Sequence, residues 1–206
     1  MNNYYKFIDI PDTTKYIDYF LNIFIKEHNF VESVKKQVNK TYIEYPIDKY
    51  HNPMITNLSN ELTKKYKFPP ISHFLLFYHI GDQNIHADGS SVPRWCSFNL
   101  PLMGWEGTKM NFYSTKPDVI STNAESRYYA ENDVIYQDHF DCTNNWVLCH
   151  SGLPHKVYNM TTENPRITLV NRFHGNPTFK VLTTLIDLFG GECGIRTHAP
   201  LFTVTD

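Results

Sequence analysis

A histidine and an aspartate two residues apart, His86 and Asp88, form the first pattern in this chain that could hold a metal ion. In an extended segment, residues two apart project to the same face, so both side chains can reach one ion. A third ligand is available in His155, which begins a predicted strand 69 residues after His86. Two imidazoles and one carboxylate on one side of an ion leave coordination positions open. This donor set suits non-haem Fe(II) working on O2 and could also hold catalytic zinc.

A second pair of the same type, His139 and Asp141, competes with the first. Only 16 residues separate His139 from His155, with one predicted strand between them. The longer distance from His86 to His155 leaves room for the several strands that bring distant ligands together in a barrel or sandwich. The first pair is therefore preferred.

Arg166 and Thr168 lie two residues apart on a predicted strand and share one of its faces. They would face His155 if that residue lies on the neighbouring strand. The apolar residues Ile167 and Leu169 predict that Arg166 is buried, where an unpaired charge is costly. A guanidinium fork beside a hydroxyl suits a planar carboxylate, and a bound dicarboxylate would offset the cost of burial.

These motifs, taken in order, resemble the 2-oxoglutarate- and Fe(II)-dependent oxygenase superfamily, in the branch that contains prolyl and aspartyl hydroxylases and phytanoyl-CoA-hydroxylase-like proteins. The resemblance covers residues 74–173, about half of the chain, and implies a double-stranded β-helix (jelly-roll) core. The matching residues are Tyr78-x-x-Gly81, His86-x-Asp88, Pro154-His155 and Arg166-x-Thr168.

The resemblance also implies roles for single residues. It makes His86, Asp88 and His155 the iron ligands. Arg166 would bind the far carboxylate of 2-oxoglutarate, assisted by the hydroxyl groups of Thr168 and Tyr78. The spacing between His155 and Arg166 fits the family pattern, which favours His155 over His150 as the distal ligand.

The reaction that the resemblance implies consumes O2 and converts 2-oxoglutarate to succinate and CO2 while a C–H bond of a small-molecule or peptidyl substrate is hydroxylated. Related halogenases have a small residue in place of the carboxylate ligand, so the presence of Asp88 favours hydroxylation over halogenation. Other residues on the strands between the two halves of the site could face the substrate, although core packing or surface exposure explains their types equally well: Arg94, Trp95, Asn99 and Tyr113.

The elements that would position these residues follow from hydrophobic periodicity. Apolar residues recur at helical spacing over residues 11–30 and 54–66, and a further helix is expected over about 178–189. Between them, short aromatic and β-branched runs separated by turn residues predict an antiparallel sandwich or barrel rather than a parallel sheet. The predicted strands are 72–80, 94–102, 109–114, 133–137, 146–150, 155–159 and 166–173.

The chain is thus expected to form one oxygenase domain over residues 1–189, with N-terminal helices within 11–66, a jelly-roll core over about 71–174 and the C-terminal helix. Residues 190–206 lack strand or helix periodicity and are expected to lie outside the core.

Composition excludes several other classes of protein. With 41% hydrophobic residues, 19% charged residues and a formal net charge of -2, the 206-residue chain is not typical of a disordered protein or of a general nucleic-acid binder. It contains no apolar run of about 18 residues and no signal-peptide layout at its N-terminus, so a cytoplasmic protein that does not bind membranes is expected. The four cysteines form no CxxC pair and are expected to be thiols.

Two other classes of function stay open from the sequence. One is a non-catalytic jelly-roll module that binds a metal or ligand, which a filled cavity beside Arg166 would favour. The other is a redox-inactive zinc enzyme that uses the same three ligands. The identity of the substrate and the oligomeric state do not follow from the sequence.

Overall fold

The computed structural model describes residues 4–27, 42–47, 52–89, 95–117, 127–158 and 165–189. Its helices are α1 (Thr13–Asp18), the π-helical segment η1 (Tyr19–Phe24), α2 (Ile25–Glu27), α4 (Pro53–Tyr66), the 3₁₀ segment η2 (Glu131–Asp133) and α5 (Phe179–Phe189). Its strands are β1 (Tyr5–Ile8), β2 (Tyr42–Pro46), β3 (Ile71–His79), β4 (His86–Ala87), β5 (Ser97–Met103), β6 (Lys109–Thr115), β7 (Arg127–Tyr128), β8 (Val134–Asp141), β9 (Trp146–Cys149), β10 (His155–Tyr158) and β11 (Arg166–Phe173).

The strands form two antiparallel sheets whose pairing is nested. One sheet has the order β1-β9-β5-β11-β3-β2, and the other has the order β7-β4-β10-β6-β8. Starting from β3, the first strand pairs with β11, β4 pairs with β10, β5 pairs with β9, and β6 pairs with β8. Strands near the two ends of this part of the chain thus pair with each other, and so do strands nearer its middle. This nested pairing is the pattern of a jelly roll. The predicted fold class, mainly β with flanking helices around a jelly-roll core, is confirmed.

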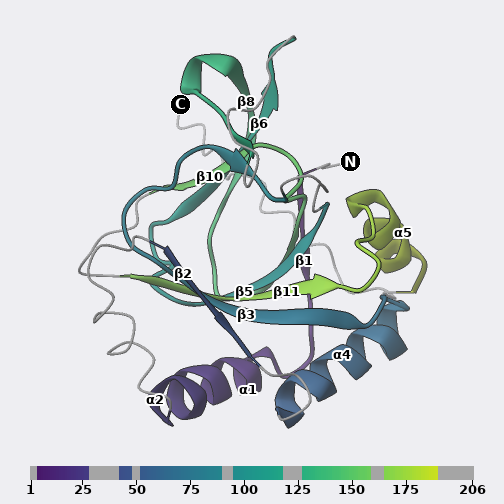
Figure 1. Ribbon diagram of the computed structural model, residues 1–206. Helices are drawn as coiled ribbons and strands as arrows, with labels where there is room; N and C mark the ends of the chain where they lie inside the picture. Colours follow the sequence, from purple (N-terminus) through teal and green to yellow (C-terminus); the bar gives the residue numbers. More distant parts are fainter. Residues whose placement is uncertain are drawn as a thin grey trace, which may run out of the picture.

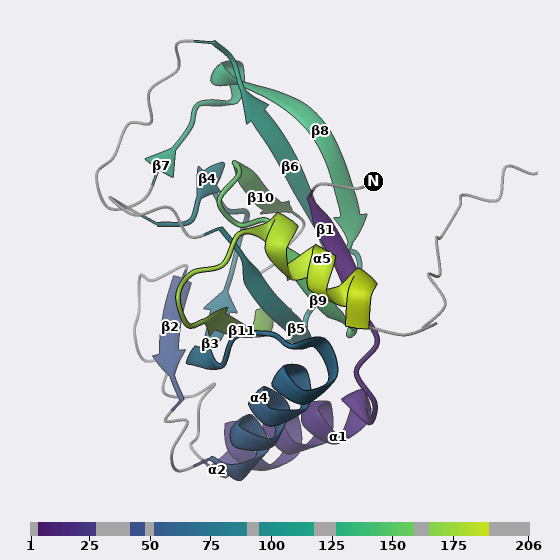
Figure 2. The same cartoon turned by 90° about the vertical axis from the view of Figure 1, so that its right-hand side faces the viewer.

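One face of the six-stranded sheet packs against the helices, as Figures 1 and 2 show from two directions. The α4 helix begins after Asn52, whose side chain accepts a hydrogen bond from the backbone N–H of Ile55. It buries the apolar stripe Ile55, Leu58, Leu62 and Tyr66. Because the facing surfaces of the helices and of the six-stranded sheet are largely apolar, the contact between them forms the main hydrophobic core of the protein.

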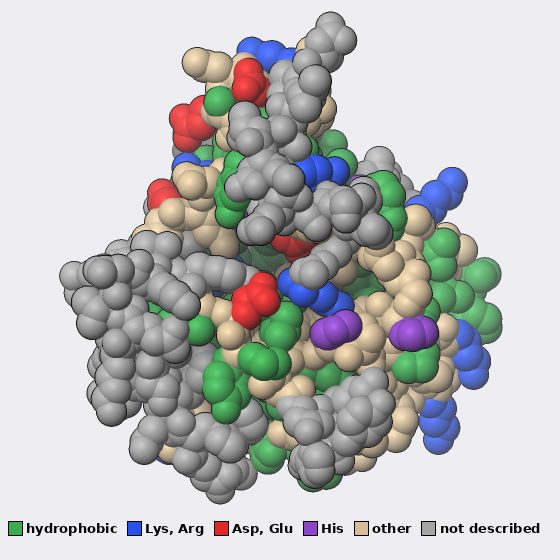
Figure 3. All heavy atoms as spheres, viewed as in Figure 1, with side chains coloured by type: hydrophobic (Ala, Val, Ile, Leu, Met, Phe, Trp, Pro, Cys, Tyr) green, Lys and Arg blue, Asp and Glu red, His purple; other side chains and the backbone are tan. Residues whose placement is uncertain are grey.

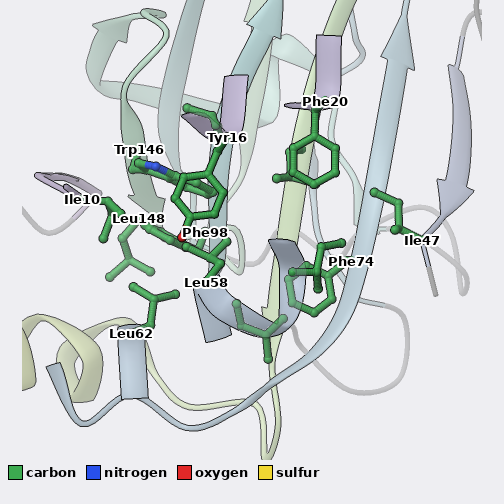
Figure 4. Packing of buried hydrophobic residues seen from close by; sticks show 14 of the residues in the cluster. Ile10, Tyr16, Phe20, Ile47, Leu58, Leu62, Phe74, Phe98, Trp146 and Leu148 are labelled. Atoms are coloured by element: carbon green, nitrogen blue, oxygen red, sulfur yellow. The ribbon is translucent and has the colours of Figure 1, made fainter. Parts of the chain in front are cut away.

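Aromatic rings fill the centre of this core (Figure 4). Trp146 of β9 stacks on Phe98 of β5 with ring centroids 4.7 Å apart, and Tyr16 of α1 meets the same indole edge-on at 5.8 Å. All three side chains are fully buried. A second, smaller cluster lies between the two sheets and includes Phe112 and Val157. The core that holds the helices is thus separate from the interior between the sheets.

Every strand predicted from the sequence is present, with bounds that differ by a few residues, and the C-terminal helix is present at residues 179–189. The predicted helix over 11–30 is interrupted by the π-helical segment η1, and residues 28–30 lie outside the described ranges. The N-terminal part is not purely helical, because β1 and β2 add strands to the edges of the first sheet. Residues 190–206, the predicted non-core tail, also lie outside the described ranges. None of the described helices is long and apolar enough to cross a membrane.

Candidate metal centre

His86 and His155 lie on paired strands of the second sheet, and Asp88 follows directly after the first of these strands. The short strand β4 pairs with β10 at a single position, where His86 lies directly opposite His155. Asp88 follows two residues after His86 and projects to the same side. Each of the three side chains offers one ligand atom, and these atoms all lie within 4.8 Å of one another. Among the described residues, this is the group of His, Cys, Asp and Glu side chains whose geometry could hold a metal ion.

Alternating burial explains why β4 presents its polar residues to the interior. Ile85 and Ala87 are 3% and 0% exposed, and Ile85 packs with Tyr113 and Val134 in a small hydrophobic cluster. With these two residues anchored on one face, the side chains of His86 and Asp88 must point to the other. The loop that leads into β4 begins at Gly81, whose φ of 71° lies in the left-handed region that favours glycine.

Backbone hydrogen bonds orient both imidazoles. Nδ1 of His86 lies 2.9 Å from the carbonyl oxygen of Asn84, and Nδ1 of His155 lies 2.8 Å from that of Leu153. A carbonyl oxygen can only accept, so each Nδ1 carries the proton and donates it. In the neutral imidazole with its proton on Nδ1, Nε2 keeps its lone pair, which is the arrangement that a metal-binding histidine needs.

The surroundings of His155 keep its imidazole neutral. Burial, followed by the neighbouring His86, lowers the pKa of His155 to about 4, and the side chain is only 5% exposed. A neutral imidazole is the form that binds a metal ion, because protonation would occupy the lone pair. At pH 7 no proton therefore has to leave His155 before an ion can bind.

A cavity of about 350 Å³ lies next to the three residues and is bounded by both sheets. The described residues that line it are Glu44, Phe77, His79, Ile80, Gly81, Asp82, Gln83, Asn84, His86, Asp88, Gly89, Ser97, Asn99, Met110, Tyr128, His155, Val157, Arg166, Thr168, Val170 and Arg172. Charged groups of both signs are among them. Acidic and basic side chains also lie next to each other near the middle of the molecular face in Figure 3, beside two histidines. The volume is sufficient for small ligands.

Arg166 and Thr168 line this cavity from β11, but they do not neighbour His155 in a sheet. The condition of a neighbouring strand is not met, because β11 pairs with β3 and β5 whereas β10 pairs with β4 and β6. In a jelly roll these two consecutive strands belong to opposite sheets. Arg166 and His155 therefore contribute to the same cavity from its two walls.

Arg166 is a buried cation with unsatisfied hydrogen-bonding capacity. It is 5% exposed, and its Nε atom finds no hydrogen-bond acceptor among the described residues. The hydroxyl group of Thr168, two residues further on the same face, also finds no partner among them. Buried polar groups without partners are costly, so a ligand with acceptor atoms would stabilise this corner of the cavity.

Arg172 lines the same cavity but has charged and aromatic neighbours. Its guanidinium lies 3.8 Å from the carboxylate of Glu44 and 5.8 Å from the ring centroid of Phe77. The two arginines of β11 thus differ in their surroundings, because a carboxylate already lies near the guanidinium of Arg172.

Tyr78 does not line the cavity. Its side chain belongs to the hydrophobic core on the helix side of the sheet, whereas its neighbours Phe77 and His79 face the cavity. Tyr78 lies opposite Ile167, which belongs to the same core. The expectation that its hydroxyl assists Arg166 and Thr168 does not agree with this placement, because successive residues of a strand point to opposite faces.

His79 is a lining residue to which the sequence analysis assigned no role. It pairs with Arg166 across β3 and β11, lies within hydrogen-bond distance of Gln83, and is 5% exposed. Burial and the nearby charge of Arg166 lower the pKa of His79 well below its usual value, so its imidazole is neutral at pH 7. His79 shares one face of β3 with Phe77, which the sequence alone can show. That this face lines the cavity beside Arg166 follows only from the register between β3 and β11.

The alternative ligands lie elsewhere. His139 is exposed on β8, and Asp141 pairs with Lys109 on the protein surface. His150 packs between Trp95 and Phe179, with ring centroids 6.3 Å and 5.3 Å away. Trp95 therefore packs beside a histidine that does not line the cavity, Asn99 does line it, and Arg94 lies outside the described residues. Of these candidate residues, His86, Asp88 and His155 are the ones whose ligand atoms lie together.

Comparison with known proteins yields matches of fold only. Neither a protein-family model nor a curated protein sequence matches the chain. Similar solved structures include E. coli YcfD (12% identity, TM-score 0.42, covering 79% of this chain and 43% of that one). They also include the non-heme α-ketoglutarate-dependent epimerase SnoN from nogalamycin biosynthesis (10% identity, TM-score 0.45, covering 83% of this chain and 79% of that one). A third is a Pseudomonas putida prolyl-4-hydroxylase (13% identity, TM-score 0.41, covering 83% of this chain and 92% of that one).

The chain spans less than half of the length of YcfD and about a third of that of hazelnut vicilin, another similar structure. The similar structures also include a description of YcfD as a ribosomal oxygenase and a structure of HygX from Streptomyces hygroscopicus with nickel and 2-oxoglutarate bound. The assignment of the jelly-roll fold rests on the nested strand pairing within the chain itself.

Proposed function

We propose that this protein is a 2-oxoglutarate- and Fe(II)-dependent dioxygenase that hydroxylates a C–H bond of a small-molecule or peptidyl substrate. The observation that carries the proposal is the composition of one cavity. It brings two histidines and an aspartate from one sheet together with a buried arginine from the other. A metal-ligand set alone would be compatible with many activities, and a buried cation alone with many anions. Their combination fits a cosubstrate that has a chelating end and a carboxylate end.

The three ligand residues fit Fe(II). Two neutral imidazole nitrogens and one carboxylate oxygen would hold the ion on one side and leave positions open on the other. The hydrogen bonds from each Nδ1 to the backbone would fix the ring orientations. When bound, Fe(II) and 2-oxoglutarate would supply the activation of O2, with 2-oxoglutarate converted to succinate and CO2.

Arg166 and Thr168 would fix the carboxylate of 2-oxoglutarate that is distant from the metal. The guanidinium of Arg166 can donate hydrogen bonds to both oxygens of a carboxylate, and the hydroxyl group of Thr168 can add another. Neither the Nε atom of Arg166 nor the hydroxyl of Thr168 is engaged by a described residue. Binding would therefore replace an unsatisfied arrangement with a satisfied one, which is a favourable exchange in a buried site.

The alternative of a non-catalytic module is disfavoured by the space beside Arg166. A filled cavity would favour such a module, whereas the described side chains leave about 350 Å³ between the two sheets. That volume leaves room for a substrate next to a five-carbon dicarboxylate. A redox-inactive zinc enzyme would use the same three ligands, so experiment must distinguish it from the iron enzyme.

The test is anaerobic titration of the purified protein with Fe(II) and then with 2-oxoglutarate. We expect one Fe(II) per chain and a weak visible charge-transfer band that develops only when 2-oxoglutarate is added. A screen of candidate substrates under O2 should then find one that stimulates succinate formation. Tight binding of Zn(II) with no band in the Fe(II) protein would contradict the proposal and favour the redox-inactive alternative.

A further inference from the structure

Arg127 connects the two segments that carry the candidate metal ligands. It lies on β7, directly opposite Ala87 of β4. Its Nη2 atom donates to the carbonyl oxygen of Asp88 and to that of Gly152, each at 3.1 Å. Asp88 is itself one of the three ligand residues, and Gly152 lies in the turn that leads into His155. One guanidinium nitrogen thus joins the backbone at both halves of the site.

The ladder between these segments is short. The strand β4 has two residues, and it pairs with β10 at the single position of His86 and His155. Beyond that position, the backbone N–H of Asp88 donates to the carbonyl oxygen of Ser151 at 2.8 Å. Asp88 follows the end of its strand, so few backbone hydrogen bonds determine where its side chain points. A side chain that holds its carbonyl group therefore has a direct effect on the carboxylate.

The guanidinium is also the chemically suitable group for this position. Two carbonyl oxygens that converge on one point repel each other, because each carries partial negative charge. A cation between them removes this repulsion and forms charge-assisted hydrogen bonds, which are stronger than neutral ones. The Nε atom of Arg127 is buried, so the side chain is held in the protein rather than extended into water.

We infer that Arg127 is a positioning residue of the metal centre, which sets the separation of Asp88 from His155 by holding the backbone at Asp88 and at Gly152. The inference rests on the proposed metal site and extends it to a residue that contacts no metal or cosubstrate. Hydrogen-bond partners outside the ligands themselves commonly contribute about 10- to 100-fold to metal affinity.

The experiment measures binding of Co(II), a spectroscopic probe for this type of site, to the metal-free protein. Arg127→Ala should weaken Co(II) binding by about 10- to 100-fold and change the visible spectrum of the bound ion. Arg127→Lys and Arg127→Gln have side chains of similar length and differ in charge. Affinity closer to that of the parent in the Lys variant would show that the cation is what matters. Lys109→Ala, which removes an exposed cation from β6 of the same sheet, serves as the control and should bind Co(II) like the parent.

The outcomes separate the two proposals. If the parent binds no Co(II), the proposed metal site fails and this inference fails with it. If the parent binds Co(II) and the Gln and Ala variants bind it with the same affinity and spectrum, Arg127 does not position the site although the site exists. Should Arg127→Ala be insoluble, the comparison of the Gln and Lys variants decides in the same way. Circular dichroism of the metal-free variants shows whether an altered affinity reflects the site or the whole fold.

Discussion

His86 and His155 face each other across β4 and β10 with ring centroids 4.4 Å apart, and each donates its Nδ1 proton to the carbonyl group two residues earlier in its own chain segment. The two rings are therefore oriented locally, by backbone that folds with them, and brought together by one strand pair. This arrangement leaves both Nε2 atoms available at one place. The geometry of the pair thus depends on the register between β4 and β10 and on the hydrogen bond that each ring makes to its own segment.

The choice between the two candidate distal histidines can be tested directly. His155→Ala should abolish the charge-transfer band of the protein with Fe(II) and 2-oxoglutarate, because it removes one of three converging ligand atoms. His150→Ala should retain the band, since His150 packs against Trp95 and Phe179 instead. Visible spectroscopy under anaerobic conditions is the measurement. The reverse result would show that the ligand set has been assigned to the wrong histidine.

Arg166 should determine the affinity for 2-oxoglutarate. Arg166→Ala removes a charge-assisted carboxylate interaction of a few kcal/mol, so binding should weaken by roughly a hundredfold while Fe(II) binding stays nearly intact. Arg172→Ala provides the comparison, because Arg172 lines the same cavity but lies beside Glu44, and its effect should be clearly smaller. Titration of 2-oxoglutarate into the Fe(II) protein measures both. Equal losses in the two variants would mean that neither arginine is specific for the cosubstrate.

Tyr78→Phe should leave the affinity for 2-oxoglutarate unchanged. Its side chain lies in the core between the first sheet and the helices, on the opposite face of β3 from the cavity. Loss of the hydroxyl group therefore removes nothing that a bound carboxylate could contact. The same titration that is used for Arg166 gives the answer. A weakened affinity would require Tyr78 to reach the cavity by a rearrangement of β3.

Tyr78 also shows how far the sequence could predict this site. Residues within one strand can be assigned to a common face by counting, which placed His86 with Asp88 and Arg166 with Thr168 correctly. Counting residues along one strand does not show which residues of another strand lie opposite them. The register of β3 against β11 places Tyr78 opposite Ile167 and so puts both in the helix-side core, and no pattern within β3 reveals that register.

The sequence also could not predict those parts of the fold that depend on pairing between distant segments. Long runs with strong periodicity, such as α4 and β11, were predicted because their own residues are sufficient to form them. The edge strands β1 and β2 and the two-residue strands β4 and β7 were not predicted as strands, since they exist through pairing with distant segments. The assignment of consecutive strands to opposite sheets is likewise a property of the whole topology. Because of this topology, Arg166 lies on the opposite wall of the cavity from His155 rather than on a neighbouring strand.

The stability of the metal-free protein should fall on mild acidification. His155 and His79 are buried as neutral imidazoles, with pKa values lowered mainly by burial, to about 4 for His155. In the unfolded chain both histidines titrate near their usual pKa of about 6.5. Below that pH the unfolded state binds more protons than the folded state, so the free energy of unfolding decreases as the pH falls from about 6.5 towards 4.

Thermal unfolding with a chelator present, at several pH values across this range, checks the expectation. His155→Asn removes one of the histidines whose pKa is lowered in the fold, so its melting temperature should depend less steeply on pH than that of the parent. The comparison between the two proteins cancels the contribution of the carboxylates that they share. Parallel pH profiles for the parent and the variant would contradict the assignment of a depressed pKa to His155.

Truncation after Phe189 should leave the protein intact. The last described element, α5, is held by its own buried residues, because Phe179 and Leu182 are 5% and 0% exposed. Asp187 of the same helix also pairs with Lys6 of β1. A chain that ends at residue 189 keeps all of these contacts. Its melting temperature, Fe(II) binding and 2-oxoglutarate turnover should therefore agree with those of the full chain within error.

A second truncation, after Pro177, is the matched control because it removes α5 itself. Loss of a buried leucine alone typically costs about 2–5 kcal/mol, and this truncation removes Phe179 as well. It should lower the melting temperature by many degrees or give insoluble protein. If the shorter truncation, after Phe189, also lowers the melting temperature by several degrees, residues 190–206 stabilise the fold, and the expectation that they lie outside the core is wrong.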